Sequence, residues 1–170
     1  IDYIEAGNPF SNPKDMEFFQ RVCELGLTHS KLVAFGSTTR VATPAKEDKN
    51  CRALLGSGAD IMAIFGKTWD LHVTQVLGTT LKENLRMIED TIAFFVKEKK
   101  QVVFDCEHFF DGYKENQDYA MQTLYSAKRA GADCLVLCDT NGGCFPDEVY
   151  EITRDVVEKL QMKIGIHAHN

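Results

Sequence analysis

The sequence lacks an apolar segment long enough to cross a membrane. Its longest apolar runs, such as Thr91–Val96, fall far short of the roughly 20 residues that a membrane helix needs. It also lacks a charged and then apolar leader at its start. Lys and Arg number 19 against 25 Asp and Glu, and this net charge of −6 disfavours a phosphate-backbone ligand. We therefore expect a soluble, cytoplasmic protein that binds neither membrane nor nucleic acid.

The sequence also lacks the cysteine and glycine patterns of several common sites. Its six cysteines include no Cys-x-x-Cys pair, and three lie inside apolar stretches, so buried reduced thiols are expected rather than a disulfide framework or a thiolate metal site. No Gly-x-Gly-x-x-Gly or Walker loop follows the first predicted strand. No serine nucleophile elbow is present, so covalent catalysis is not indicated.

What the sequence does contain is a series of apolar runs of strand length. They are continuous rather than alternating, which is typical of strands buried on both faces. The runs are Ile1–Ile4, Lys31–Phe35, Ile61–Phe65, Gln101–Cys106, Cys134–Cys138 and Lys163–Ile166. Between them, apolar residues recur at steps of three and four, as in Leu81–Phe95 and Val149–Leu160, which predicts amphipathic helices. Helix-start signals are Asn12-Pro13, Thr80 with Glu83, Asn116 and Pro146, and helix-stop signals are Gly26 and Gly131.

Strand and helix alternate along the whole chain. Strand ends recur roughly every 30 residues, at Glu5, Ser37, Gly66, Glu107, Asp139 and His167. A repeated βα unit implies a parallel sheet, either a barrel or an open doubly wound sheet. Polar residues after nearly every strand favour the barrel. We expect a partial (β/α)₈ TIM barrel: one domain fragment, residues 1–170, that supplies the second to the seventh strand and lacks the first and last βα units.

The sharpest candidate for a metal site is the segment 164–170. Residues i and i+2 of a strand point to the same side, so His167 and His169 would project together at the strand exit, where barrel enzymes keep their chemistry. Two imidazoles aimed at one point suit a divalent metal whose shell is completed by carboxylates or waters. The alternative is that both are ordinary polar residues at a strand end.

A carboxylate follows another predicted strand, in the run 102–112. Alternation places Val103, Asp105 and Glu107 on one face, with Glu107 nearest the exit. There Glu107 could act as a general base or a metal ligand, because a partly dry site raises a carboxyl pKa toward working pH. The alternative is a solvated or helix-capping group, and for Asp111 we favour it.

Three further residues follow predicted strands with weaker signals. Thr140 shares a face with Val136 and Cys138 and could bind a substrate carboxylate, although its Asp-Thr-Asn-Gly-Gly segment is also good turn chemistry. Glu5 lies between apolar residues, where a substrate-binding role and a structural ion pair are equally open. His72 could reach the substrate or lie on the surface.

Four segments together resemble a known enzyme family. They are Tyr3-Ile4-Glu5-Ala6-Gly7, Glu107-His108-Phe109-Phe110-Asp111-Gly112, Cys138-Asp139-Thr140-Asn141-Gly142-Gly143 and Ile166-His167-Ala168-His169-Asn170. In order and spacing they resemble the 2-isopropylmalate synthase, homocitrate synthase and citramalate synthase family of metal-dependent TIM barrels, over essentially the whole chain. The runs Glu107–Tyr113 and Phe65–His72 look most like the citramalate synthase branch.

The resemblance implies an acyltransferase that condenses acetyl-CoA with a small 2-oxo acid, pyruvate or 2-oxoisovalerate, to give citramalate or 2-isopropylmalate for branched-chain amino acid biosynthesis. It implies that His167 and His169 bind a divalent metal (Mg²⁺, Mn²⁺ or Zn²⁺), that Glu107 is the base, and that Thr140 contacts the oxo acid's carboxylate. Glu5 matches an acidic residue of the pocket. The intact parent is expected to be a homodimer.

The sequence departs from this family at its start. The family's first strand carries an Asp-x-Thr-x-Arg-(Asp/Glu)-Gly motif, which supplies a metal carboxylate and an arginine, and nothing precedes Ile1 here. We therefore expect the 170-residue chain alone to be inactive and its intact parent to be an enzyme. Two alternatives stay open: a carbon–carbon lyase of the 3-hydroxy-3-methylglutaryl-CoA lyase type, and a non-catalytic binding fragment.

Overall fold

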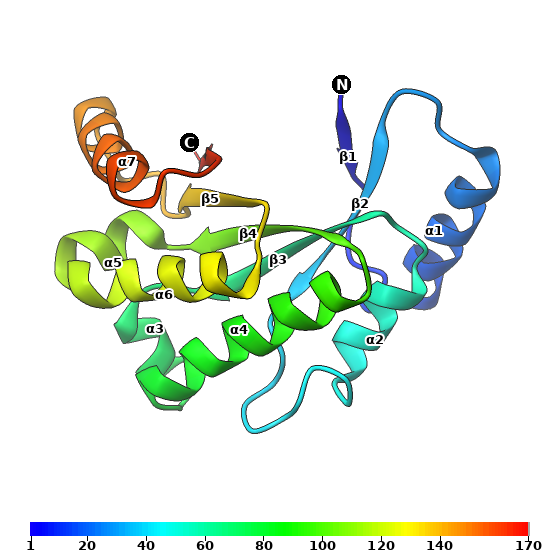
Figure 1. Cartoon of the computed structure of the whole chain (residues 1–170), viewed down its shortest axis with the longest axis horizontal. Helices are drawn as coiled ribbons and strands as arrows, with labels where there is room; N and C mark the ends of the chain where they lie inside the picture. The colour runs from blue at the N-terminus through cyan, green and yellow to red at the C-terminus, as the bar shows by residue number, and fades with distance from the viewer. Residues whose placement is uncertain (170) are drawn as a thin grey trace.

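Six strands form a single parallel sheet in the computed structural model, which describes residues 1–169 (Figure 1). The strands are β1 (Tyr3–Glu5), β2 (Lys31–Ser37), β3 (Ile61–Lys67), β4 (Gln101–Glu107), β5 (Cys134–Asp139) and β6 (Ile164–Ala168). Their order in the sheet is the order in the chain. A doubly wound sheet reverses its strand order at a switch point, so this sequential order is that of a partial barrel. The predicted fold class is confirmed.

Helices fill each connection and lie on the outer side of the curled sheet (Figure 1). They are α1 (Pro13–Leu25), α2 (Lys49–Gly56), α3 (Asp70–Gln75), α4 (Leu81–Lys97), α5 (Phe109–Glu115), α6 (Gln117–Ala130) and α7 (Pro146–Leu160). Both ends of the described chain lie at the open side of the curl, with β1 and β6 as the two edges of the sheet (Figure 1). The inner face is therefore open to solvent along one side.

The helix boundaries follow the predicted capping residues. The side chains of Asn12, Thr80 and Asn116 accept hydrogen bonds from backbone N–H groups in the first turns of α1, α4 and α6. Pro146 begins α7, and the Glu148 carboxylate accepts a hydrogen bond from the backbone N–H of Phe145, the N-cap residue. Gly26 and Gly131 end α1 and α6 in the left-handed conformation. The short helices α3 and α5 gave no clear signal in the sequence.

All six strands extend further at their carboxyl ends than the apolar runs predicted. β2, β3 and β4 continue to Ser37, Lys67 and Glu107, because these polar residues still pair in the ladder, with Ser37 opposite Phe65 and Lys67 opposite Glu107. The polar exit residues are therefore held on regular strands rather than on loops. Side chains on such strands have well-defined directions, which matters for a site built at this edge.

The two faces of the sheet carry different clusters of apolar residues. The main core lies between the outer face and the helices, and includes Phe104 and Leu135 from strands and Ile92 and Phe95 from α4. A smaller cluster of Val33, Ile61 and Ala63, with Phe35 and Val103 beside it, lies on the inner face. Burial on both faces explains why the strand sequences are continuously apolar.

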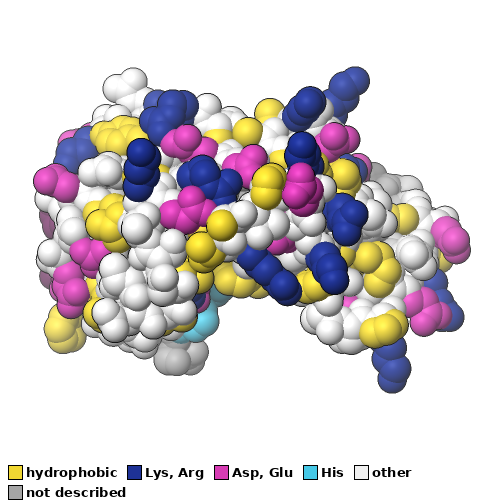
Figure 2. All heavy atoms as spheres, turned by 90° about the horizontal axis from the view of Figure 1, so that it is seen from below, with side chains coloured by type: hydrophobic (Ala, Val, Ile, Leu, Met, Phe, Trp, Pro, Cys, Tyr) yellow, Lys and Arg dark blue, Asp and Glu magenta, His cyan; other side chains and the backbone are white. Residues whose placement is uncertain are grey.

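The outer surface of the helical layer is polar and mixed in charge. Figure 2 shows Lys and Arg interspersed with Asp and Glu, without a large region of one sign. Among the helices of residues 1–169, none combines the length and the apolar character needed to cross a bilayer.

Replacing Gly112 with alanine is expected to destabilise the protein by about 1–3 kcal/mol, because a Cβ there would lie 2.6 Å from the carbonyl oxygen of Thr68 and 2.9 Å from Cα of Trp69. Urea unfolding measures the loss. The matched control is Gly56→Ala, since Gly56 is also helical but has nothing within 4 Å of its added Cβ. That change should be neutral or stabilise by up to about 1 kcal/mol. Equal effects at both positions would contradict the packing argument.

Candidate active site

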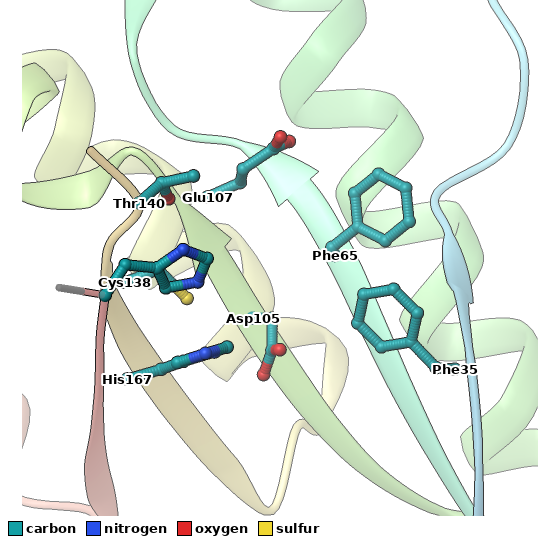
Figure 3. A pocket seen from close by; sticks show the side chains of 8 residues that line it. Phe35, Phe65, Asp105, Glu107, Cys138, Thr140 and His167 are labelled. Carbon is teal, nitrogen blue, oxygen red and sulfur yellow. The ribbon is translucent and has the colours of Figure 1, made fainter. Parts of the chain in front are cut away.

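A cavity of about 270 Å³ opens on the inner face at the carboxyl ends of the strands (Figure 3). Its lining side chains come from five neighbouring strands or the residue just beyond them: Phe35, Phe65, Asp105, Glu107, Cys138, Thr140, His167 and His169. Successive residues of a strand point to opposite faces, so only every second residue reaches this space. The carboxyl ends of barrel strands are the usual place for catalytic groups.

The structure brings four of the predicted site residues to this one cavity. Glu107, Thr140, His167 and His169 all line it. The ring centroids of His167 and His169 are 4.8 Å apart, as expected for positions i and i+2 at a strand end. Glu5 is outside the lining set, but it lies close enough for His167 to influence its titration.

His72 is the second predicted site residue outside the lining set. It lies on α3, where its ring packs 4.7 Å from Trp69 and 4.4 Å from His108, centroid to centroid. Burial, and then the neighbouring His108, lowers its pKa. Its Nδ1 is buried and finds no hydrogen-bond partner in the described part of the chain. Its contact with substrate stays a prediction.

A cluster of three donor groups in the cavity could hold a metal ion. One ligand atom each from Asp105, Cys138 and His167 lie within 4.8 Å of one another. Sequence reasoning identified only the histidine of this trio as a ligand. The signal was present, because strand alternation put Asp105 on the face of Glu107, and Cys138 on the face of Thr140, but alternation does not say that β4, β5 and β6 lie side by side.

The electrostatics of the cavity are set by acidic groups at or beside its wall, of which Asp105 is partly buried and Glu5 is exposed. Burial, and then the charge of Glu5, raises the pKa of Asp105 to about 6. Burial, and then the charges of Asp105 and Glu107, raises the pKa of Cys138 to about 12, so the thiol is protonated at neutral pH. Burial also raises the pKa of Glu5, and nearby His167 opposes that shift. Gathered acidic groups of this kind favour a cation among them.

Glu107 is the one carboxylate of the cavity lining that pairs with a cation within the described residues. Its Oε2 lies 2.6 Å from Nζ of Lys67, the residue beside it on β3. The backbone carbonyl of Glu107 also accepts a hydrogen bond of 2.8 Å from the hydroxyl of Thr68. Sequence reasoning missed Lys67, although it stands at a strand exit as the other site residues do.

Thr140 lies in the predicted turn and also lines the cavity, and its contact with a substrate carboxylate stays a prediction. The preceding Asp139 is buried, and its carboxylate accepts hydrogen bonds from the N–H groups of Gly143 and Cys144, which makes the segment a tight turn. The Thr140 hydroxyl accepts a hydrogen bond of 2.9 Å from the N–H of His108 and faces the cavity. The turn therefore holds Thr140 in place.

Asp111 links two loops near the cavity. Its Oδ2 lies 3.2 Å from Nδ1 of His108 and accepts a hydrogen bond of 3.0 Å from the side-chain amide of Asn141. The sequence favoured a solvated or helix-capping group, whereas the structure shows a side chain that bridges α5 and the loop after β5. His108 itself has a positive φ of 56°, which turns the chain sharply from β4 into α5.

The sequence matches the protein family described as HMGL-like over residues 1–170. It is 49% identical over 170 residues to an (R)-citramalate synthase of Sulfolobus acidocaldarius and 50% identical over 171 residues to one of Aquifex aeolicus. Each alignment covers 100% of this chain and 32% of the relative. The crystal structure of hydroxymethylglutaryl-CoA lyase from Pseudomonas aeruginosa matches with a TM-score of 0.76 and 18% identity, over 99% of this chain and 56% of that one. This structural likeness concerns the fold.

Replacing Asp105 with asparagine is expected to stabilise the protein at pH 7. The folded-state pKa of about 6 exceeds the ordinary value of 3.8, so the folded protein binds this proton more tightly, and stability falls as pH rises through that interval. Asp105→Asn removes this cost and should raise the free energy of unfolding at pH 7 by about 1–2 kcal/mol. Urea unfolding between pH 4 and pH 7, roughly the span of the two values, measures it.

The control for this comparison is Asp2→Asn, the same chemical change at an exposed residue. It should leave the pH profile of stability unchanged. A wild-type profile that is flat or rising across the interval, with Asp105→Asn no more stable than Asp2→Asn, would contradict the assignment.

Proposed function

This chain belongs to the HMGL-like family, and we propose that it forms part of the catalytic barrel of an acyltransferase that condenses acetyl-CoA with pyruvate to give citramalate. The resemblance to the citramalate synthase branch is confirmed by the family match and by the two relatives at 49% and 50% identity. The chain spans 32% of the length of these relatives, so the activity proposed is that of a longer protein. The observation that carries the proposal is that Glu107, Thr140, His167 and His169 line one cavity.

In the proposed reaction, Glu107 is the general base. A C–H bond of the acetyl methyl group breaks, its proton passes to the Glu107 carboxylate, and its electron pair moves toward the thioester carbonyl oxygen. The methyl carbon then bonds to the keto carbon of pyruvate as the C=O π electrons move to the keto oxygen, which takes a proton from solvent. Water then breaks the C–S bond of the thioester, giving a carboxylate and releasing the CoA thiol. Thr140, whose hydroxyl is already oriented by His108, would bind the pyruvate carboxylate.

The donor set fits a divalent transition metal. His167 and His169 would hold the ion, with Asp105 and Cys138 beside His167. Imidazole and sulfur donors suit Zn²⁺, whereas Mn²⁺ and Mg²⁺ prefer oxygen donors such as the carboxylate of Asp105. When bound, such an ion supplies Lewis acidity at the keto oxygen of the 2-oxo acid.

The aromatic wall of the cavity supports a short 2-oxo acid. Phe35 and Phe65 stack with their ring centroids 5.1 Å apart and line the cavity opposite the histidines (Figure 3). Rings stacked in this way limit the room for a branched side chain. Because one methylene in such a pocket changes binding by about 1–3 kcal/mol, this wall would favour pyruvate over 2-oxoisovalerate.

The organisation of the longer protein is also part of this proposal. Residues 1–170 would be a fragment of a single barrel domain, inactive alone because the first strand of the family, with its carboxylate and arginine, is needed at the same edge. The cytoplasmic location and the homodimer expected from the sequence stay predictions.

Titration calorimetry with Mn²⁺ tests the metal site. The protein should bind Mn²⁺, and His167→Ala should weaken binding by about 10-fold or more. Mn²⁺ binding by the wild-type protein should also weaken below about pH 6, because Asp105 then takes up a proton. The control is His29→Ala, an exposed histidine that precedes β2 and is outside the cavity lining. Unchanged affinity in His167→Ala would reject ligation by this histidine.

The activity itself is tested by incubating the full-length protein with acetyl-CoA and pyruvate and measuring citramalate. Glu107→Gln should lower kcat by about 10²–10⁴-fold, because it removes the base while keeping the shape of the side chain. Glu98→Gln, the same change at an exposed residue at the end of α4, should have no effect. Cleavage of 3-hydroxy-3-methylglutaryl-CoA without any condensation would favour the lyase alternative instead, and citramalate formation by the 170-residue chain would refute its predicted inactivity.

A further inference from the structure

Lys67 is the residue of the site whose role the proposed function does not yet explain. It ends β3 directly opposite Glu107 in the strand ladder, and its ammonium lies 2.6 Å from Glu107 Oε2. Both side chains are largely buried, with 16% of Lys67 and 25% of Glu107 exposed. A pair so placed has lost most of its hydration, so it is held more firmly than an ion pair on the surface.

The backbone of Lys67 is itself anchored. Its carbonyl oxygen accepts a hydrogen bond of 2.8 Å from the side-chain amide of Asn84, a fully buried residue of α4. The same amide nitrogen donates a hydrogen bond of 2.8 Å to the hydroxyl of Tyr119 on α6. The end of β3 is thereby tied to the helical layer, and Lys67 projects from a rigid position.

Lys67 uses only one of the two oxygens of Glu107. Its ammonium contacts Oε2, and no residue of the described chain donates a hydrogen bond to Oε1. A carboxylate held at one oxygen and free at the other can accept a proton without first breaking a contact. Holding the glutamate side chain in advance removes the conformational entropy that would otherwise be lost when it is ordered for the reaction.

The second carboxylate on the same face of β4 has no such support. Asp105 also lines the cavity, but no Lys or Arg of the described chain forms an ion pair with it. Its donor atom instead lies near those of Cys138 and His167. The two carboxylates of β4 therefore have different partners. Glu107 lies beside a cation, and Asp105 lies beside two potential metal ligands.

The ion pair also stands between two cavities. Glu107 lines the cavity described above, whereas Lys67 lines a neighbouring one of about 310 Å³ with Ser37, Arg40, Leu77 and Met87. Phe65 lines both. A condensation must bring two substrates together at one base, so a base at the boundary of two spaces can reach a reactant on either side.

We propose that Lys67 is the positioning residue for Glu107: it holds Oε2 at the boundary of the two cavities and so presents Oε1 to the methyl group of the acyl donor. The role rests on the proposed function, because it assigns proton abstraction to Glu107. Lys67 acts through Glu107 and not by contact with the reacting atoms.

The test compares Lys67→Met, which keeps the length of the side chain and removes its charge, with Lys67→Arg, which keeps the charge, in the full-length protein. Lys67→Met should lower kcat by about 100-fold, as expected for a misplaced base, while KM for both substrates changes by less than about 3-fold. The kcat of Lys67→Arg should be about 10-fold or more above that of Lys67→Met. Acetyl-CoA deuterated at the methyl group should give a larger isotope effect on kcat in Lys67→Met, because proton abstraction becomes the slow step.

Lys82→Met, the same substitution at an exposed residue of α4, is the control and should behave as wild type. Crystal structures of wild type and Lys67→Met supply a readout without activity, in which the Glu107 carboxylate should leave its position on the cavity wall. A Glu107 that stays in place, or a kcat within about 3-fold of wild type, would overturn the positioning role. A wild-type protein that forms no citramalate would count against the proposed function, and the crystal structures would still decide the role of Lys67.

Discussion

Parallel pairing of neighbouring strands is the constraint on which the site depends. Because the strands run in one direction and pair in sequence order, all their carboxyl ends meet at one edge. Alternation then sends every second side chain to the inner face. Pairing of Cys138 with His167 in the ladder places a thiol beside an imidazole, and pairing of Lys67 with Glu107 places a cation beside a carboxylate. The chemistry of the cavity is thus a direct consequence of register.

The outer face of the sheet packs into the main core, whereas the inner face carries the side chains of the candidate active site. The outer face and the helices enclose the large apolar core, which includes fully buried Phe104 and Phe95. The inner face has only a small apolar cluster around Val33 and Ile61, and above it come groups that are costly to bury. The raised pKa of Asp105 reflects the free-energy cost of burying its negative charge. The main core can offset this free-energy cost, because it is built from the outer face and the helices and does not include the residues of the inner face.

Glu107 and Asp105 illustrate how the same residue type acquires different chemistry within one strand. They are two positions apart and line the same cavity, yet Glu107 pairs with Lys67 whereas Asp105 lies near Cys138 and His167. The difference comes from the neighbouring strands, β3 on one side and β5 on the other. A carboxylate beside a cation is held in one orientation, and a carboxylate among potential metal ligands favours a bound cation.

The βα repeat and the capped helix ends could be predicted from the sequence, because they follow from local periodicity. The placement of Glu107, Thr140, His167 and His169 at one edge could be predicted as well, because parallel βα units put all strand exits at the same edge and alternation orients every second side chain. The fold, in contrast, is what brings Lys67 to Glu107 and Asp105 and Cys138 to His167, and what packs His72 against His108 outside the cavity lining. Those contacts join residues about 30 to 60 positions apart on different elements. They depend on which strands are neighbours and in what register, and a chain's local pattern does not contain that information.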